Sequence, residues 1–197
     1  MKKTKVCVFT SSHTYNDIRI YHKEVTSLVE AGYDVTLIAL DDSKCKGIES
    51  VKLVLLPERD GRMQRLFFNV AALFFLTIKT NAKIYHFHDP ELMFVGVFLR
   101  LIGKKVIYDA HEDLVNNLKS KKWIGNLLFR SLFATMYGIL EKGCCLFFHN
   151  IITVTDGIGL RYSPKKVVIL RNFPILKLVG NEIEDIDVKK KKPINRF

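Results

Sequence analysis

Short apolar runs alternate with longer amphipathic segments along most of the chain. The runs are rich in Val, Ile, Leu and aromatic residues, which is typical of strands buried on both faces of a sheet. They predict strands at residues 5–10, 33–40, 51–56, 83–88, 105–110, 150–155 and 166–170. Between them, apolar positions recur with helical spacing and predict helices at residues 20–32, 62–80, 90–103 and 123–142.

The order of these elements indicates the fold class. Gly32 stands at the end of the helix predicted at residues 20–32, where a C-cap glycine belongs. Pro90 stands in the first turn of the helix predicted at residues 90–103. Strands that alternate with helices form right-handed βαβ units. We therefore expect an α/β fold, a Rossmann-like parallel sheet with helices on both faces. The pattern fades after Pro174, so we expect one domain over residues 1–174 and a charged tail over residues 175–197.

Composition narrows the class of partner. The chain has 197 residues, 48% of them hydrophobic, and a formal net charge of +11, which favours an anionic partner. We do not expect nucleic acid, because the lysines are scattered and are not interleaved with aromatic residues. The four cysteines form no CxxC pair, so neither a zinc knuckle nor a disulfide framework is indicated. This cysteine usage favours a reducing, cytoplasmic compartment.

Polar residues follow several of the predicted strands. They lie at residues 10–17, 88–91, 109–113 and 155–156. Ligands of open parallel sheets bind outside the carboxyl ends of the strands, so we expect these segments to converge on one rim. Asp89 has a simpler alternative role as the N-cap of the helix that starts at Pro90. His111 is a poor cap, and it lies between Asp109 and Glu112, which favour its protonated form.

Two kinds of site fit this rim. His86, His88 and His111 with Asp89 and Asp109 would make a metal cluster, and His86 and His88 share one face of a strand. No HxxxH pair or cysteine ligand supports that cluster, and we expect no metal site. The other possibility is a site for a sugar or a phosphate. Carboxylates hydrogen-bond hydroxyl groups, histidine transfers protons, and helix N-termini accept phosphate.

Five segments are informative because of their order and spacing along the chain. They are "NDIRIYHKEVTSLVEAGYDVTLIA", "YHFHDPELM", "GKKVIYDAHED", "IITVTDGI" and "VVILRNFP". Together they resemble the N-terminal domain of family 4 retaining glycosyltransferases of GT-B architecture, over residues 4–174. The resemblance implies transfer of a sugar from a nucleotide-sugar to a glycan or lipid-linked acceptor in surface polysaccharide synthesis. It implies no cofactor besides the nucleotide-sugar, which is a substrate.

The resemblance also assigns roles to the rim. His111 would approach the transferred sugar and act as the catalytic residue, by positioning or polarising the sugar rather than attacking it. The substrate-binding residues would be Asp17, Arg19, His88, Asp89, Glu91, Asp109, Glu112, Thr155, Asp156 and Asn172. Asn172 would stand where the chain crosses to a second domain.

The sequence departs from the family in two places. The segment "SSHTYNDIR" lacks the glycines that let backbone approach a diphosphate, so we expect no glycine phosphate cradle. The donor-binding second domain has no counterpart in the last 23 residues. We therefore expect either the acceptor-side half of a split enzyme, partnered by a donor-domain chain, or a truncated product, and in both cases a chain inactive alone. The alternative is a non-catalytic remnant or a membrane-surface adaptor.

Two segments bear on membrane contact. Residues 65–79 are very apolar, but their uninterrupted core is shorter than the about 20 residues of a membrane span, and we expect them to pack on the sheet. Residues 121–142 combine Trp123 and large apolar residues with lysines and an arginine. That composition favours an interfacial helix on an anionic membrane, on its cytoplasmic face.

Overall fold

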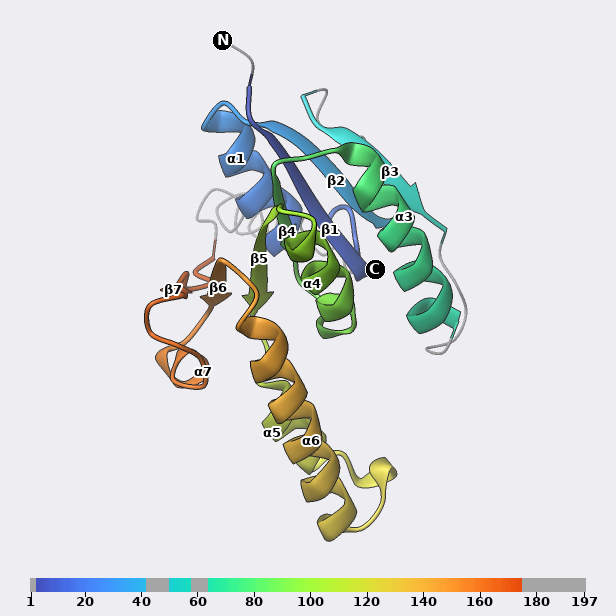
Figure 1. The fold of residues 1–197 in the computed structure, drawn as a ribbon, viewed down its shortest axis with the longest axis vertical. Helices are drawn as coiled ribbons and strands as arrows, with labels where there is room; N and C mark the ends of the chain where they lie inside the picture. The colour runs from blue at the N-terminus through green and yellow to red at the C-terminus, as the bar shows by residue number, and fades with distance from the viewer. Residues whose placement is uncertain (1–2, 42–49, 58–63, 175–197) are drawn as a thin grey trace, which may run out of the picture.

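The structure, a computed structural model, describes residues 3–41, 50–57 and 64–174. It contains one parallel sheet of seven strands in the order β3-β2-β1-β4-β5-β6-β7 (Figure 1). The strands are β1 (Lys5–Thr14), β2 (Asp34–Leu40), β3 (Lys52–Leu56), β4 (Ile84–Phe87), β5 (Lys105–Ala110), β6 (Asn150–Thr153) and β7 (Val167–Ile169). All seven predicted strands are present, and the Rossmann-like α/β class is confirmed. The predicted tail, residues 175–197, lies outside the described residues.

The helices lie on both faces of the sheet. They are η1 (Ile18–Val25), α1 (Thr26–Glu30), η2 (Arg65–Asn69), α3 (Val70–Thr80), η3 (Pro90–Leu92), α4 (Met93–Leu101), α5 (Leu114–Ser120), η4 (Lys122–Ile124), α6 (Leu127–Cys145) and α7 (Asp156–Gly159). Helices α3, α4 and α6 cover one face, and η1 with α1 covers the other. The strand order reverses between β1 and β4, so the fold has its topological switch point there.

Strand β4 shows how the sequence divides its side chains between the two faces. Tyr85 and Phe87 enter the larger core cluster, together with Leu73 of α3 and Leu99 of α4. Because side chains alternate along a strand, His86 points to the opposite face, next to the helix η1. A polar residue therefore occupies a core position at the carboxyl end of the strand.

The first βα unit agrees with the sequence except at its boundaries. Strand β1 continues to Thr14, four residues beyond the predicted end. The following helix starts at Ile18 because the Asp17 carboxylate accepts hydrogen bonds from the backbone N–H groups of Arg19 and Ile20. Gly32 has a φ of 86°, the left-handed conformation expected of a residue that ends a helix.

The helix predicted at residues 123–142 is wrong at its start, and α5 was not predicted at all. Gly125 has a φ of 128°, which no helix continues through. Helix α6 therefore begins after Asn126, whose side chain accepts from the backbone N–H of Phe129 at 2.8 Å. The separate helix α5 starts after Asp113, whose carboxylate accepts from the backbone N–H of Asn116.

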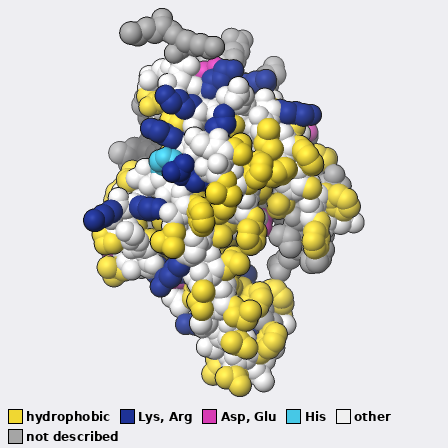
Figure 2. Space-filling model, in the orientation of Figure 1, with side chains coloured by type: hydrophobic (Ala, Val, Ile, Leu, Met, Phe, Trp, Pro, Cys, Tyr) yellow, Lys and Arg dark blue, Asp and Glu magenta, His cyan; other side chains and the backbone are white. Residues whose placement is uncertain are grey.

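Helices α5 and α6 extend away from the sheet side by side (Figure 1). The far part of α6 exposes large apolar side chains, among them Leu128 at 80% and Met136 at 61%, and Trp123 of η4 is 71% exposed. Figure 2 shows apolar side chains over the same face of the molecule from α3 and α4 down to the end of α6. Among the described helices, none has the length and apolar character needed to cross a membrane.

Candidate functional site

The end of β1 and the segments at the ends of β4 and β5 meet at the carboxyl edge of the sheet and enclose a cavity of about 350 Å³. We call it the rim cavity. It is lined by Ser12, His13, His88, Asp89, Pro90, Glu91, Tyr108, Asp109, His111, Glu112, Leu114 and Lys121. Three of the four polar segments expected at one rim therefore converge there.

Asp89 fixes the end of β1. Its carboxylate accepts hydrogen bonds from the Thr10 hydroxyl at 2.6 Å, the Ser11 backbone N–H at 2.7 Å and the Ser12 hydroxyl. Burial opposes its charge, but these donors hold the pKa of Asp89 below its ordinary value. Asp89 stands at the N-cap position before Pro90, yet its side chain makes no capping bond. The capping role considered from the sequence is therefore wrong, and Asp89 ties the segment after β4 to the end of β1.

The backbone N–H groups at the end of β1 already have acceptors within the protein. The Ser11 N–H is bound by Asp89, and the N–H groups of Ser12 and His13 point to the Thr10 hydroxyl at 3.4 and 3.1 Å. A loop in this conformation does not present a row of free N–H groups to a phosphate. Its geometry agrees with the absence of glycine in the segment.

Asp109 joins the end of β5 to the start of η1. Arg19 donates to both of its oxygens, from Nε at 3.0 Å to Oδ2 and from Nη2 at 2.9 Å to Oδ1. His111 Nδ1 lies 3.7 Å from Oδ1 of the same carboxylate. Burial opposes protonation of His111, but Asp109 outweighs it and raises the pKa of the imidazole above its ordinary value. His111 is therefore a partly exposed group biased toward positive charge.

His13 brings a second imidazole to the rim cavity. Its ring centroid lies 5.7 Å from that of His111. The hydrogen bond with Asp17, whose Oδ2 lies 3.3 Å from Nδ1, raises the pKa of His13 above its ordinary value. The cavity thus places two protonatable rings beside carboxylates and hydroxyls, a set of groups suited to a ligand that carries hydroxyl groups and negative charge.

A second cavity of about 360 Å³ lies beside η1 and α1. We call it the side cavity. It is lined by Arg19, Lys23, Glu24, Ser27, Leu28, His86, Ile107, Asp109, Ile152, Leu170, Arg171 and Asn172. Lys23 Nζ contacts the Asn172 side-chain oxygen and the Phe173 carbonyl. Asp109 lines both cavities, so they are separated by its carboxylate.

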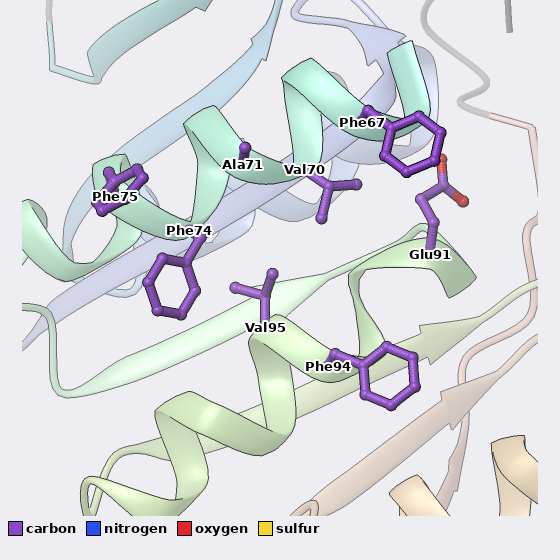
Figure 3. A pocket seen from close by; sticks show the side chains of 8 residues that line it. All are labelled: Phe67, Val70, Ala71, Phe74, Phe75, Glu91, Phe94 and Val95. Atoms are coloured by element: carbon purple, nitrogen blue, oxygen red, sulfur yellow. The ribbon is translucent and has the colours of Figure 1, made fainter. Parts of the chain in front are cut away.

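An apolar groove of about 650 Å³ runs between α3 and α4 (Figure 3). It is lined by Phe67, Val70, Ala71, Phe74, Phe75, Phe94 and Val95, with Glu91 at one end. Phe67, Phe75 and Phe94 are each more than 60% exposed. Glu91 accepts a hydrogen bond from the Ser11 hydroxyl at 2.7 Å and also lines the rim cavity. The groove and the rim cavity are therefore neighbours.

The structure divides the eleven residues expected at the site into two groups. Eight line a cavity, namely His88, Asp89, Glu91, Asp109, His111 and Glu112 at the rim cavity and Arg19 and Asn172 at the side cavity. Three line neither. Asp17 caps η1, the Thr155 hydroxyl accepts from the Ile158 N–H and caps α7, and Asp156 pairs with Arg171 at 2.9 Å.

Glu24 is a site residue that the sequence reasoning missed. It lies on η1 and contacts His86 and His88 on the floor between the cavities. One signal was available, since Ile20, Glu24 and Leu28 are four residues apart and form one helical stripe. A carboxylate on an apolar stripe indicates a buried polar partner on the sheet beneath.

Comparisons with known proteins support this description. No protein-family model matches the sequence, and no curated protein matches it. Among solved structures, sucrose-phosphate synthase from Thermosynechococcus elongatus superposes with a TM-score of 0.63 at 14% identity, over 94% of this chain and 53% of that one. The fold is that of one half of a GT-B glycosyltransferase.

Two further GT-B structures agree. LpCGTa in complex with UDP gives a TM-score of 0.59 at 9% identity, over 93% of this chain and 57% of that one. Anabaena Alr3699/HepE in complex with UDP and glucose gives a TM-score of 0.56 at 10% identity, over 94% of this chain and 50% of that one. The chain therefore spans about half the length of these GT-B proteins.

Proposed function

We propose that the chain is the acceptor-side half of a glycosyltransferase that moves a sugar from a nucleotide-sugar to a glycan or lipid-linked acceptor in surface polysaccharide synthesis. The observation that carries this proposal is the rim cavity. It lies at the switch point of the sheet, where α/β folds bind ligands, and it combines carboxylates, hydroxyls and imidazoles. The fold is shared with structures that hold UDP, or UDP and glucose.

The rim residues suit the chemistry of sugar transfer. Glu112 offers an acceptor for sugar hydroxyls, and the His111 ring offers a hydrogen-bond donor. A preorganised donor stabilises negative charge that develops as a diphosphate leaves. His111 therefore positions and polarises the transferred sugar, and the ordered loop held by Asp89 supplies the adjacent wall.

A donor-side half completes the site. The lining of the side cavity includes Lys23 and Arg171, which are positive groups suited to a nucleotide diphosphate held from the other side. Positioning two reactants contributes up to roughly 7–11 kcal/mol to lowering a barrier, and one wall alone provides little of it. The chain by itself therefore transfers no sugar at a detectable rate.

The apolar groove favours a lipid-linked acceptor. Its aromatic lining suits a hydrocarbon chain, and Glu91 connects it to the rim cavity. An acceptor with a polar head in the rim cavity would lay its chain between α3 and α4 (Figure 3). The groove is the observation that separates this acceptor from a free glycan, which would leave it empty.

Such an acceptor would bring the chain to the cytoplasmic face of a membrane as a peripheral protein. Helix α6 carries exposed apolar residues together with the basic residues Arg130 and Lys142. These residues form a surface suited to an anionic bilayer. The same surface is the observation that favours the alternative function, a non-catalytic membrane-surface adaptor. An adaptor needs the surface but not His111.

The role of His111 tests the proposal. In an extract from source cells that lack this chain, purified wild-type chain is expected to restore transfer from added nucleotide-sugars. His111→Ala is expected to restore about 10²-fold less, because a well-aligned contact made in the transition state is lost. The matched control is His22→Ala, since His22 lies outside both cavities and contacts Asn16. Equal restoration by the His111 and His22 variants would favour the adaptor.

A further inference from the structure

Four potential metal ligands meet on the floor between the two cavities. Glu24 comes from η1, His86 from the end of β4, His88 from the loop after it, and Asp109 from the end of β5. One ligand atom from each lies within 4.8 Å of every other. The set contains two imidazoles and two carboxylates, brought together from three separate parts of the chain.

The contacts inside this cluster are close. Glu24 Oε2 lies 2.9 Å from His88 Nε2, and its Oε1 contacts His86 Nδ1. On its other side, His88 Nδ1 lies 3.5 Å from Asp109 Oδ2. The two imidazole rings are stacked, with centroids 5.0 Å apart. Both histidine side chains are more than nine-tenths buried.

One nitrogen of each imidazole in the cluster lacks a hydrogen-bond partner. His86 Nε2 and His88 Nδ1 are buried and make no hydrogen bond with any residue that the structure describes, while Glu24 contacts the other nitrogen of each ring. Buried polar atoms in native proteins are nearly always hydrogen-bonded, and each exception calls for an explanation such as an ion.

We propose that Glu24, His86, His88 and Asp109 bind one divalent transition-metal cation, with Zn²⁺ as the best fit. Zn²⁺ takes four nitrogen and oxygen ligands at about 2.0–2.2 Å in tetrahedral geometry, so its ligand atoms lie roughly 3.3–3.6 Å apart. The four ligand atoms here lie within 4.8 Å of one another, so the widest separations would contract by about 1 Å around the ion. Two carboxylates balance the charge of the ion, and imidazole nitrogen excludes Mg²⁺ and Ca²⁺ as preferred occupants.

Arg19 supplies the outer support that such sites use. Its guanidinium donates to both oxygens of Asp109 and fixes the orientation of that carboxylate. The cluster differs from the metal alternative read from the sequence, because Asp89 is occupied by donors of the β1 loop and Glu24 takes its place. The ion would hold η1 against β4 and β5, beneath both cavities. The site goes beyond the proposed function and does not depend on it.

Metal content and thermal unfolding of the untagged full chain test the site. After chelator treatment and dialysis against micromolar Zn²⁺, wild type is expected to retain one Zn²⁺ per chain and to unfold at a higher temperature than the metal-free chain. Glu24→Gln, which keeps the side-chain shape, and His86→Ala are expected to retain at least tenfold less metal and to show no such rise. Co²⁺ in place of Zn²⁺ is expected to give the visible absorption of a tetrahedral site.

The matched control is Glu30→Gln. Glu30 is an exposed glutamate at the end of α1, six residues after Glu24, and this variant is expected to bind metal like wild type. Circular dichroism establishes that each variant is folded. A folded wild-type chain that retains no Zn²⁺ would overturn the proposal and leave the cluster as a set of proton-sharing ion pairs. Retention of the full equivalent by Glu24→Gln would overturn it equally.

Discussion

At the scale of the residue, carboxylates with similar positions at the strand ends have different surroundings. Asp89 is surrounded by hydroxyl and backbone donors of the β1 loop, whereas Asp109 is surrounded by Arg19 and imidazoles. The first therefore shapes the cavity wall. The second links Arg19 of η1 to the imidazole of His111.

The pair of His13 and Asp17 gives a pH prediction. The hydrogen bond from Asp17 raises the pKa of His13 above its ordinary value of 6.5. The folded-state pKa exceeds the unfolded one, so the pair stabilises the fold fully below about pH 6.5, and this contribution is lost as pH rises through the folded-state pKa. The other ionisable groups that face His13 are Asp89, Glu112 and His111.

An NMR titration of the His13 ring measures this directly. Asp17→Asn is expected to lower the pKa of His13, while the amide can still cap η1. His22, which is hydrogen-bonded to Asn16 instead, serves as the internal control within the same spectra. A His13 titration that is the same in both proteins would show that Asp17 does not hold the proton.

Sequence reasoning at this scale succeeded where position along a strand decides the outcome. His111, Asp89 and Glu91 follow strands directly, so the sheet carries them to its rim. It failed where only the fold brings partners together, as with Glu24, which lies 62 residues before His86. It also could not show that the side-chain oxygens of Asp17 and Thr155 would accept hydrogen bonds as helix caps.

At the scale of the element, α6 is attached to the body by a buried ion pair. Glu141 of α6 is fully buried and contacts Arg161, which follows α7 and also donates to Asp113 at 3.0 Å. Removing one partner of a buried pair leaves an uncompensated charge. The position of the protruding helix therefore depends on Arg161.

Unfolding in urea is expected to show this dependence. Arg161→Ala should lower the free energy of unfolding by about 3–5 kcal/mol. Arg171→Ala is the matched control, because its pair with Asp156 is exposed at 55% and 67% and should contribute at most about 1 kcal/mol. Equal losses in the two variants would mean that Glu141 does not need its partner.

The exposed face of α6 gives a prediction about membranes. Flotation with liposomes is expected to recover more chain from anionic than from neutral vesicles, and added salt should reduce the difference. Each nearby Lys or Arg contributes about 1 kcal/mol. Lys142→Glu is therefore expected to weaken flotation, while Lys52→Glu, at the far edge of the sheet, should not. Equal recovery from both kinds of vesicle would remove the electrostatic attraction.

The α5–α6 pair also marks the limit of sequence patterns for elements. Apolar spacing continues through residues 121–130, so periodicity alone joins them into one helix. The break depends on the backbone of Gly125 and on two side-chain caps, which a pattern of apolar positions does not contain.

At the scale of the whole molecule, the sequence predicted the sheet well because alternation of strands and helices constrains topology strongly. It could not predict which surfaces stay open. The rim cavity opens at the carboxyl edge of the sheet, the side cavity opens beside η1 and α1, and the groove opens between α3 and α4. Side-chain packing decides these surfaces, and packing follows from the fold rather than from local pattern.

The most direct measurement is product formation on adding back the chain. Nucleotide-sugars are supplied to an extract of source cells that lack the chain, with and without purified wild-type chain, and to the chain alone with cell lipids. Glycosylated lipid is then sought in the organic phase by mass spectrometry. We predict that product forms only when extract and chain are combined, because each supplies one half of the site. Product made by the chain alone, or by the extract without it, would contradict the account, and product confined to the aqueous phase would contradict a lipid-linked acceptor.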